Sequence, residues 1–179
     1  MPSQIFSPDT GKKGQKPLRI KTKKLRPDAK LPKRGSDKAA GYDLYACTDH
    51  HGVFAIPPHT TLKIGTGISM AIPDGYFGAI FARSGIATKQ GLRPANCVGV
   101  VDSDYRGEII VALHNDTGKR QTFANGDRVA QLVIMQHFPV DFDEVDDLDE
   151  TERGDGGFGS TGKNDKPDEM PGQMSLFNE

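Results

Sequence analysis

The 179-residue chain contains no tryptophan, only two cysteines, and no apolar run approaching 18 residues. Without such a run we expect no transmembrane helix, and the Lys-rich start lacks the apolar stretch of a signal peptide. Cys47 and Cys97 are far apart and form no CxxC motif, which excludes a disulfide framework and a cysteine-rich zinc site. The five histidines have neither HxxxH nor HxH spacing, so we expect no metal bound by them. Together these absences predict a cytoplasmic protein of a reducing compartment.

Turn-forming residues are abundant, with 21 glycines and 12 prolines, more than a helical bundle tolerates. The net charge of −1 conceals an asymmetry: residues 1–34 have eleven Lys and Arg against two Asp, whereas residues 141–179 have thirteen Asp and Glu against three Lys and Arg. Nucleic-acid binding by the basic end is one interpretation, but that end lacks interleaved aromatics. We therefore expect solvated ends that attract each other weakly, and no direct nucleic-acid or membrane partner.

The chain divides into four segments by composition. Residues 1–17 have almost nothing to bury, and we expect a disordered basic extension. Residues 18–138 consist of short apolar runs broken by turns, which predicts one β-structured domain. Residues 139–162 form an acidic linker and a glycine-rich arm, and residues 163–179 a polar, flexible tail.

The period-2 runs give the fold class. Ile109, Val111 and Leu113 alternate with more exposed positions, which predicts a half-buried strand. A second run, Ile68 to Ile72, ends at a Pro-Asp-Gly turn before a return strand over residues 76–82. Residues 129–135 are apolar on both faces except at Gln131, so we expect a strand buried from both sides. One helix is predicted over residues 84–91, capped by Ser84 and ended by Gly91. The pattern predicts an all-β barrel or sandwich with one short helix.

Two clusters have the residue types that bind phosphate. Arg83, Ser84 and Gly85 stand at the start of the predicted helix, where free N–H groups and an Arg suit an anion, although an ordinary helix start explains them equally well. Residues 153–162 combine five glycines with Ser and Thr, whose N–H and hydroxyl groups can surround phosphate oxygens. This segment lacks the Lys of a Walker A loop, and a flexible linker is the alternative.

Two further clusters place polar side chains on predicted strands. Valines run into Asp102 within residues 100–107, which puts a carboxylate at the end of a strand, although a turn that caps a hairpin has the same composition. In residues 126–131, Arg128 and the unexpected Gln131 could both face a ligand.

Five motifs in fixed order then resemble those of the trimeric deoxyuridine triphosphatase (dUTPase) family. They read AAGYDLYA (residues 39–46), ARSGIA (82–87), NCVGVVDSDYRG (96–107), GDRVAQLV (126–133) and RGDGGFGSTG (153–162). The resemblance covers about residues 18–162. It implies a distorted β jelly-roll barrel, assembled as a homotrimer in which the C-terminal arm is swapped to close a neighbouring active site.

By that resemblance the protein hydrolyses dUTP to dUMP and pyrophosphate, which limits uracil in DNA and supplies dUMP for thymidylate synthesis. Asp102 would activate the water that attacks the α-phosphorus, with Mg²⁺ held by substrate phosphates and water and by no direct protein ligand. Asp43 and Arg128 would support the site. Phosphate binding is implied for Arg83, Ser84, Gly85, Gln131, Arg153, Gly159, Ser160 and Thr161.

Base and sugar recognition follows from the same resemblance. A hairpin from Asn96 to Val101 would pair with uracil through its backbone and the Asn96 amide, and reject cytosine, whose donor and acceptor are reversed. Tyr105 would exclude a ribose 2′-hydroxyl, and Phe158 would stack on the base. The implied uracil and deoxyribose contacts are Asn96, Gly99, Val100, Val101, Tyr105, Ile110 and Phe158.

Three alternatives remain open at this point. A dCTP deaminase shares the fold but resembles this chain less in the third motif and lacks the full glycine-rich arm. A dUTPase-like regulatory protein without catalysis is not favoured, because Asp102, Arg83 and the fifth motif are present. The tail adds a further hypothesis: Gln173-Met174-Ser175-Leu176-Phe177 resembles the segment by which bacterial proteins bind the replication sliding clamp, though the segment could equally pack on the protein itself.

Overall fold

The computed structural model describes residues 17–48 and 52–156. The chain divides into two units, residues 1–139 and 140–179. Within the described part, no helix is long and apolar enough to span a membrane. The elements of the first unit, in chain order, are β1 (Lys21–Lys24), β2 (Lys33–Arg34), β3 (Tyr42–Tyr45), β4 (Val53–Ile56), β5 (Thr61–Gly65), β6 (Ile68–Ala71), β7 (Tyr76–Phe81), α1 (Ser84–Gln90), β8 (Leu92–Pro94), β9 (Gly99–Val101), β10 (Ile110–Asn115), β11 (Gln121–Ala124) and β12 (Arg128–Gln136).

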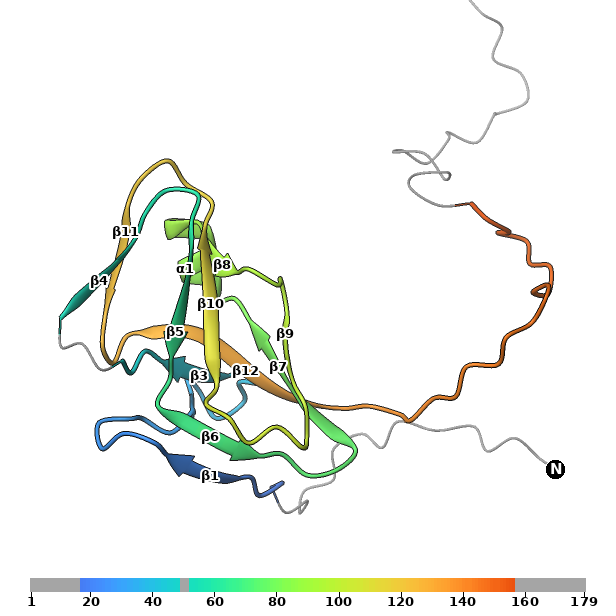
Figure 1. Ribbon diagram of the computed structural model, residues 1–179, viewed down its shortest axis with the longest axis horizontal. Helices are drawn as coiled ribbons and strands as arrows, with labels where there is room; N and C mark the ends of the chain where they lie inside the picture. Colours follow the sequence, from blue (N-terminus) through green and yellow to red (C-terminus); the bar gives the residue numbers. More distant parts are fainter. Residues whose placement is uncertain (1–16, 49–51, 157–179) are drawn as a thin grey trace, which may run out of the picture. The chain divides into compact units, whose positions relative to one another are not determined.

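The strands form four antiparallel sheets (Figure 1). The largest has the order β2-β3-β12-β7-β9, with the long strand β12 at its centre. A second sheet has the order β5-β10-β8, and the pairs β1-β6 and β11-β4 complete the fold. Strands that are neighbours in a sheet are often far apart in the chain, as β3 and β12 are. The predicted all-β architecture with one short helix is therefore confirmed.

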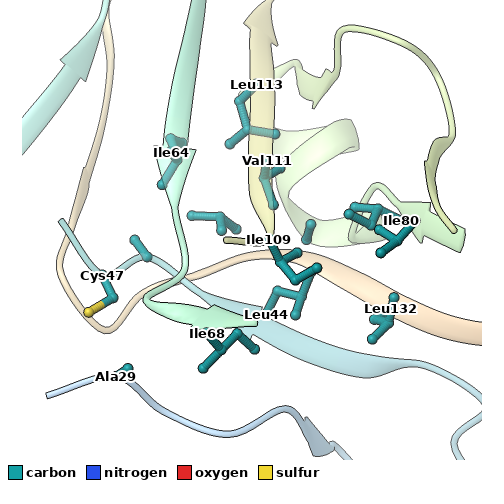
Figure 2. Packing of buried hydrophobic residues seen from close by; sticks show 14 of the residues in the cluster. Ala29, Leu44, Cys47, Ile64, Ile68, Ile80, Ile109, Val111, Leu113 and Leu132 are labelled. Atoms are coloured by element: carbon teal, nitrogen blue, oxygen red, sulfur yellow. The ribbon is translucent and has the colours of Figure 1, made fainter. Parts of the chain in front are cut away.

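The core is a single cluster to which all four sheets contribute buried side chains. Ile109, Val111 and Leu113 are at most 2% exposed, whereas Ile110 between them is 47% exposed, so the predicted alternation is confirmed. Figure 2 shows their side chains near Ile64 of β5, with Leu44 of β3 close to Ile109. Burial of such apolar side chains contributes about 1.5–3 kcal/mol each, which makes this cluster the main source of stability.

Two expectations about secondary structure are corrected. The strand at residues 129–135 is buried on both faces only as far as Leu132, and Met135 is 42% exposed, because β12 extends beyond the core. The residue that caps α1 is Arg83, in extended conformation, and not Ser84, which is the first helical residue. Arg83 provides no side-chain cap because its guanidinium binds elsewhere. The predicted stop at Gly91 is confirmed, with φ of 61° in the left-handed region that glycine tolerates.

A polar contact lies at the edge of the core. The Cys47 thiol is buried and donates a hydrogen bond to the Asp28 carboxylate at 3.4 Å. Burial, and then this carboxylate, raise the pKa of Cys47 to about 11. The thiol therefore stays protonated at neutral pH and behaves as a small core residue. Cys97, by contrast, is exposed.

The described part of the second unit, residues 140–156, forms neither helix nor strand. Its apolar side chains are exposed, with Phe142 at 93% and Leu148 at 85%. Near its end, the backbone N–H of Gly154 donates to the Thr151 carbonyl and hydroxyl, and Arg153 Nε donates to the Gly156 carbonyl at 2.9 Å. Local contacts thus shape the start of the fifth motif.

Candidate active site

An ion-pair cluster joins the first, second and fourth motifs. Asp43 of β3 accepts Arg83 Nε at 2.7 Å on one carboxylate oxygen and Arg128 Nη1 at 3.3 Å on the other. The Asp43 side chain is 13% exposed, against 24% for Arg83 and 50% for Arg128. One largely buried carboxylate therefore fixes two arginines, and the two positive charges are only partly neutralised. The set Asp43, Arg83, Arg128 and Gln131 is called the Asp43 cluster below.

Gln131 joins this cluster through strand register. In β12 it lies opposite both Asp43 of β3 and Phe81 of β7, so three neighbouring strands meet at this level. Its side-chain Nε2 donates to the Ala82 carbonyl at 2.8 Å, directly before Arg83. Gly41 leaves the space that its side chain occupies, because a Cβ there would collide with the amide oxygen. This explains the half-buried glutamine that the sequence pattern left unaccounted for.

Donor groups beside Arg83 remain available. The Arg83 carbonyl accepts the N–H groups of Ile86 and Ala87, which begins the helix. Ser84 and Gly85 are exposed, and their backbone N–H groups have no acceptor among residues 17–48 and 52–156. A cavity of about 270 Å³ next to Arg83 and Arg128 is lined also by apolar side chains of α1, β8 and β11 and by Asp127, whose carboxylate accepts the Ala124 N–H at 2.8 Å. The arrangement suits a polyanion.

A larger cavity lies elsewhere in the described part of the chain. Its volume is about 620 Å³, and its lining is mostly apolar, with Leu18, Ile20, Leu31, Leu132 and Ile134 among the residues. It contains none of the predicted site residues. Its size therefore does not identify it as the place of the chemistry.

The third motif has a different construction. Asp102 follows β9, which pairs with β7 and is the edge strand of its sheet as far as the described residues go. Asp102 and Asn96 are exposed, Val100 is 62% exposed and Tyr105 is 45% exposed. On its open side, β9 leaves backbone N–H and C=O groups that no strand of the described chain takes. Residues 102–107 are called the 102–107 turn below.

The expected hairpin from Asn96 to Val101 is wrong. β8 pairs with β10 and β9 pairs with β7, so the segment between them passes from one sheet to another. A tight turn connects them: Cys97 N donates to the Pro94 carbonyl, Val98 N donates to the Asn96 carbonyl at 2.6 Å, and Cys97 has φ of 60°. Pairing with distant strands, which local sequence does not encode, overrides the hairpin.

Within one chain, Asp102 and the Asp43 cluster do not lie close together. The register Gly78↔Val101 puts Asp102 near the start of β7, whereas Arg83 follows its end (Figure 1). Six residues of extended strand separate these levels, or about 20 Å at about 3.3 Å per residue. Asp102 and the Asp43 cluster are therefore at opposite ends of the same strand pair.

The remaining predicted residues belong to the second unit or fall outside the description. Arg153 is in the second unit, with the local contacts given above. Phe158, Gly159, Ser160 and Thr161 lie outside the described residues, as does the segment 173–177.

Sequence reasoning did not single out Glu108, whose carboxylate binds Arg26 at 2.6 Å. The sequence signal beside it is Gly65, where a Cβ would lie 2.6 Å from the Glu108 carboxylate oxygen.

No group of three or more His, Cys, Asp or Glu suitable for a metal occurs in the part of the chain that the structure describes. Both Asp43 oxygens are occupied by arginines. A carboxylate engaged by two arginines does not fit a protein-built metal cage within this cluster.

Comparison with known proteins gives the family. A family model described as dUTPase matches residues 27–162. The chain belongs to the dUTPase family. It is 49% identical over 128 residues to the deoxyuridine 5′-triphosphate nucleotidohydrolase of Corynebacterium glutamicum, covering 71% of this chain and 83% of that protein. The corresponding protein of Candida albicans is 43% identical over 119 residues, or 66% of this chain and 71% of the relative.

Solved structures agree with the dUTPase fold. A variant of the Staphylococcus bacteriophage 80alpha dUTPase with dUpNHpp has a TM-score of 0.71 and 25% identity, covering 81% of this chain and 99% of that one. The dUTPase from phage phi11 of S. aureus shares the fold at 22% identity, with a TM-score of 0.66 and coverage of 75% and 100%. The dUTPase jelly roll is therefore the fold of this chain, and dUTPases are hydrolases of a triphosphate anhydride.

Proposed function

We propose that the protein hydrolyses dUTP to dUMP and pyrophosphate in the active site of a homotrimer. The observation that carries the proposal is the Asp43 cluster, in which residues of three dUTPase motifs fix Arg83 beside Gln131. In this reaction, water oxygen bonds to the α-phosphorus, and the bond to the bridging oxygen of pyrophosphate breaks. The products would limit uracil in DNA and supply dUMP for thymidylate synthesis.

Arg83 and its neighbours bind the phosphates. The guanidinium is oriented by Asp43 through Nε, and its two terminal nitrogens have no partner among the described residues. They can donate to phosphate oxygens, together with the Ser84 hydroxyl, the Gly85 N–H and Gln131. Such oriented donors need no rearrangement as charge develops, which favours the transition state. Arg153, Gly159, Ser160 and Thr161 of the fifth motif would complete binding at the γ end.

Asp102 is proposed as the general base. Its exposed carboxylate can accept a proton from the attacking water, a role that contributes on the order of 10²–10⁴-fold. Mg²⁺, when bound to phosphate oxygens and water, neutralises charge at the triphosphate. The dUTPase of phage phi11 contains a structural Mg(II) ion, which is a property of that protein.

The open edge of β9 would recognise the base. Backbone groups of Gly99, Val100 and Val101, with the Asn96 amide, can pair with uracil, and cytosine would leave such groups unpaired at roughly 1–3 kcal/mol each. Ile110, 47% exposed, and Tyr105 would contact the deoxyribose, where Tyr105 excludes a 2′-hydroxyl. Phe158 would stack on the uracil.

The homotrimer with an exchanged C-terminal arm is part of the proposal. Support comes from the roughly 20 Å between the levels of Asp102 and Arg83 in one chain, which is too far for one triphosphate to contact both ends of the site directly. A site assembled from two chains removes this distance.

Two expectations stay predictions: the cytoplasmic location, and binding of the sliding clamp by residues 173–177. For the clamp, capture of purified clamp protein by the full chain and by a chain ending at Gln173 would be compared. Equal capture would contradict clamp binding.

The reaction is tested by pyrophosphate release from dUTP, dCTP, dTTP and UTP in the presence of Mg²⁺. We expect turnover of dUTP alone, and a loss of 10²–10⁴-fold in Asp102→Asn. Ammonia release from dCTP would support the deaminase alternative. A folded trimer that turns over no nucleotide would favour the non-catalytic regulatory alternative.

A further inference from the structure

The 102–107 turn is closed by its own contacts. Tyr105 N donates to the Asp102 carbonyl at 3.2 Å, and Arg106 Nη1 donates to the carbonyls of Ser103 and Tyr105 at 2.6 and 2.9 Å. These bonds give the turn its shape. They do not attach it to the rest of the fold.

The Tyr105 ring is attached through residue 108. Its hydroxyl donates to the Glu108 carbonyl at 3.1 Å. The ring lies directly over Gly107, where a Cβ would come within 2.6 Å of the ring carbon Cζ. The position of the tyrosine therefore depends on where the backbone of residue 108 lies.

The Glu108 side chain is fixed from two other segments. One carboxylate oxygen accepts Arg26 Nη1 at 2.6 Å and the Gly67 backbone N–H at 2.7 Å. A Cβ at Gly65 would lie 2.6 Å from the same oxygen, so the β5–β6 turn packs closely on it. The two side chains of the ion pair are 24% and 20% exposed. Partial burial makes such a charged contact stronger and its loss more costly than at an exposed site.

We propose that Glu108 is a positioning residue for Tyr105, with Arg26 as its counter-ion. By fixing the carbonyl that accepts the Tyr105 hydroxyl, the ion pair determines how strictly the site rejects a 2′-hydroxyl. This inference rests on the proposed function, since it assigns the sugar contact to Tyr105. It gives residues outside the five motifs a part in specificity.

The test is the ratio of kcat/KM for dUTP to that for UTP in Glu108→Gln. The amide keeps the size and the acceptor for Gly67 N–H but removes the charge that binds Arg26. We expect the ratio to fall about tenfold, mainly through better use of UTP, while kcat for dUTP changes less than about threefold. In the double variant with Tyr105→Phe, the ratio should fall by less than the product of the two separate decreases. Both changes weaken the same contact, the hydrogen bond from the Tyr105 hydroxyl to the Glu108 carbonyl.

Asp116→Asn is the matched control. It removes the Arg93–Asp116 pair at 2.8 Å, which is about 40% exposed and does not contact the 102–107 turn. The dUTP to UTP ratio should stay at the wild-type value. Should Glu108→Gln fail to fold, Arg26→Gln tests the same ion pair from the more exposed side.

An unchanged ratio in a folded Glu108→Gln or Arg26→Gln enzyme would overturn the proposal, as would full additivity with Tyr105→Phe. A wild type that turns over no nucleotide would instead contradict the proposed function. The positioning role would then be judged by amide hydrogen exchange over residues 103–107. Faster exchange in Glu108→Gln supports it, and equal exchange overturns it.

Discussion

The two ends of the β7–β9 strand pair are built in different ways. At the Arg83 end, function depends on side chains that ion pairs fix, with Asp43 as the common partner. At the Asp102 end, the candidate groups are the backbone of an edge strand and exposed side chains on a turn. A triphosphate needs concentrated positive charge, which the two arginine side chains supply at this end. A base needs donors and acceptors at fixed spacing, which a strand edge offers.

The largest expected effect tests whether these ends belong to one site made by two chains. Arg83→Ala and Asp102→Asn should each be nearly inactive as pure proteins. When the two are co-expressed with different tags, each mixed trimer should have one site in three that combines the intact halves, restoring about a third of wild-type activity in the doubly tagged fraction. Pyrophosphate release from the doubly tagged fraction is the measurement. No recovery above the pure variants would mean that each site uses one chain only.

The next effect concerns the ion-pair end alone. Asp43→Asn should lower kcat/KM for dUTP by about ten- to a hundredfold, because the Arg83 guanidinium loses its orienting charge. The choice between dUTP and UTP should not change. Arg128→Met, which removes the longer 3.3 Å contact, is the comparison and should cost less. Equal losses in both variants would contradict the central role of Asp43.

The Asp102 end is tested by a glycine-to-alanine substitution in the 102–107 turn. Gly107→Ala adds a methyl group where the Tyr105 ring lies, so the ring must move. We expect dUTP turnover to fall by a few-fold and UTP discrimination to weaken by a similar factor. Gly118→Ala, at a glycine with open space around it, provides the control. Unaltered discrimination in Gly107→Ala would show that the ring position does not select the sugar.

The smallest effect on activity is expected in the core, outside both ends. The folded-state pKa of Cys47 is about 11, against 9.0 for an ordinary thiol, so folding favours the protonated form. The stability from this difference is complete below pH 9 and is lost as the pH rises toward 11. It amounts to about 2–3 kcal/mol. Urea unfolding of the wild type and of Cys47→Ala between pH 7 and 11 isolates this contribution of Cys47. If the free energies of unfolding of the two proteins change in parallel with pH, the contribution is contradicted.

The sequence predicted the fold better where the signal is local. The alternation at Ile109–Leu113 and the stop at Gly91 are properties of neighbouring residues, and both are confirmed. The pairing of β8 with β10 and of β9 with β7 joins distant segments, so the expected hairpin was wrong. For the site, motif order indicated which residues matter, but not that Asp43 joins Arg83 to Arg128. The Arg26–Glu108 pair spans 82 positions and has no sequence pattern of its own.

The length of β9 has a consequence for association between proteins. An open strand edge is a template on which another chain can add a strand and begin to aggregate. β9 has three residues, Gly99–Val101, and rises only about 10 Å, too little for a stable extra strand. The same length suits a single flat heterocycle. An edge this short can therefore stay open to a small molecule in a crowded solution while other polypeptides find too little to pair with.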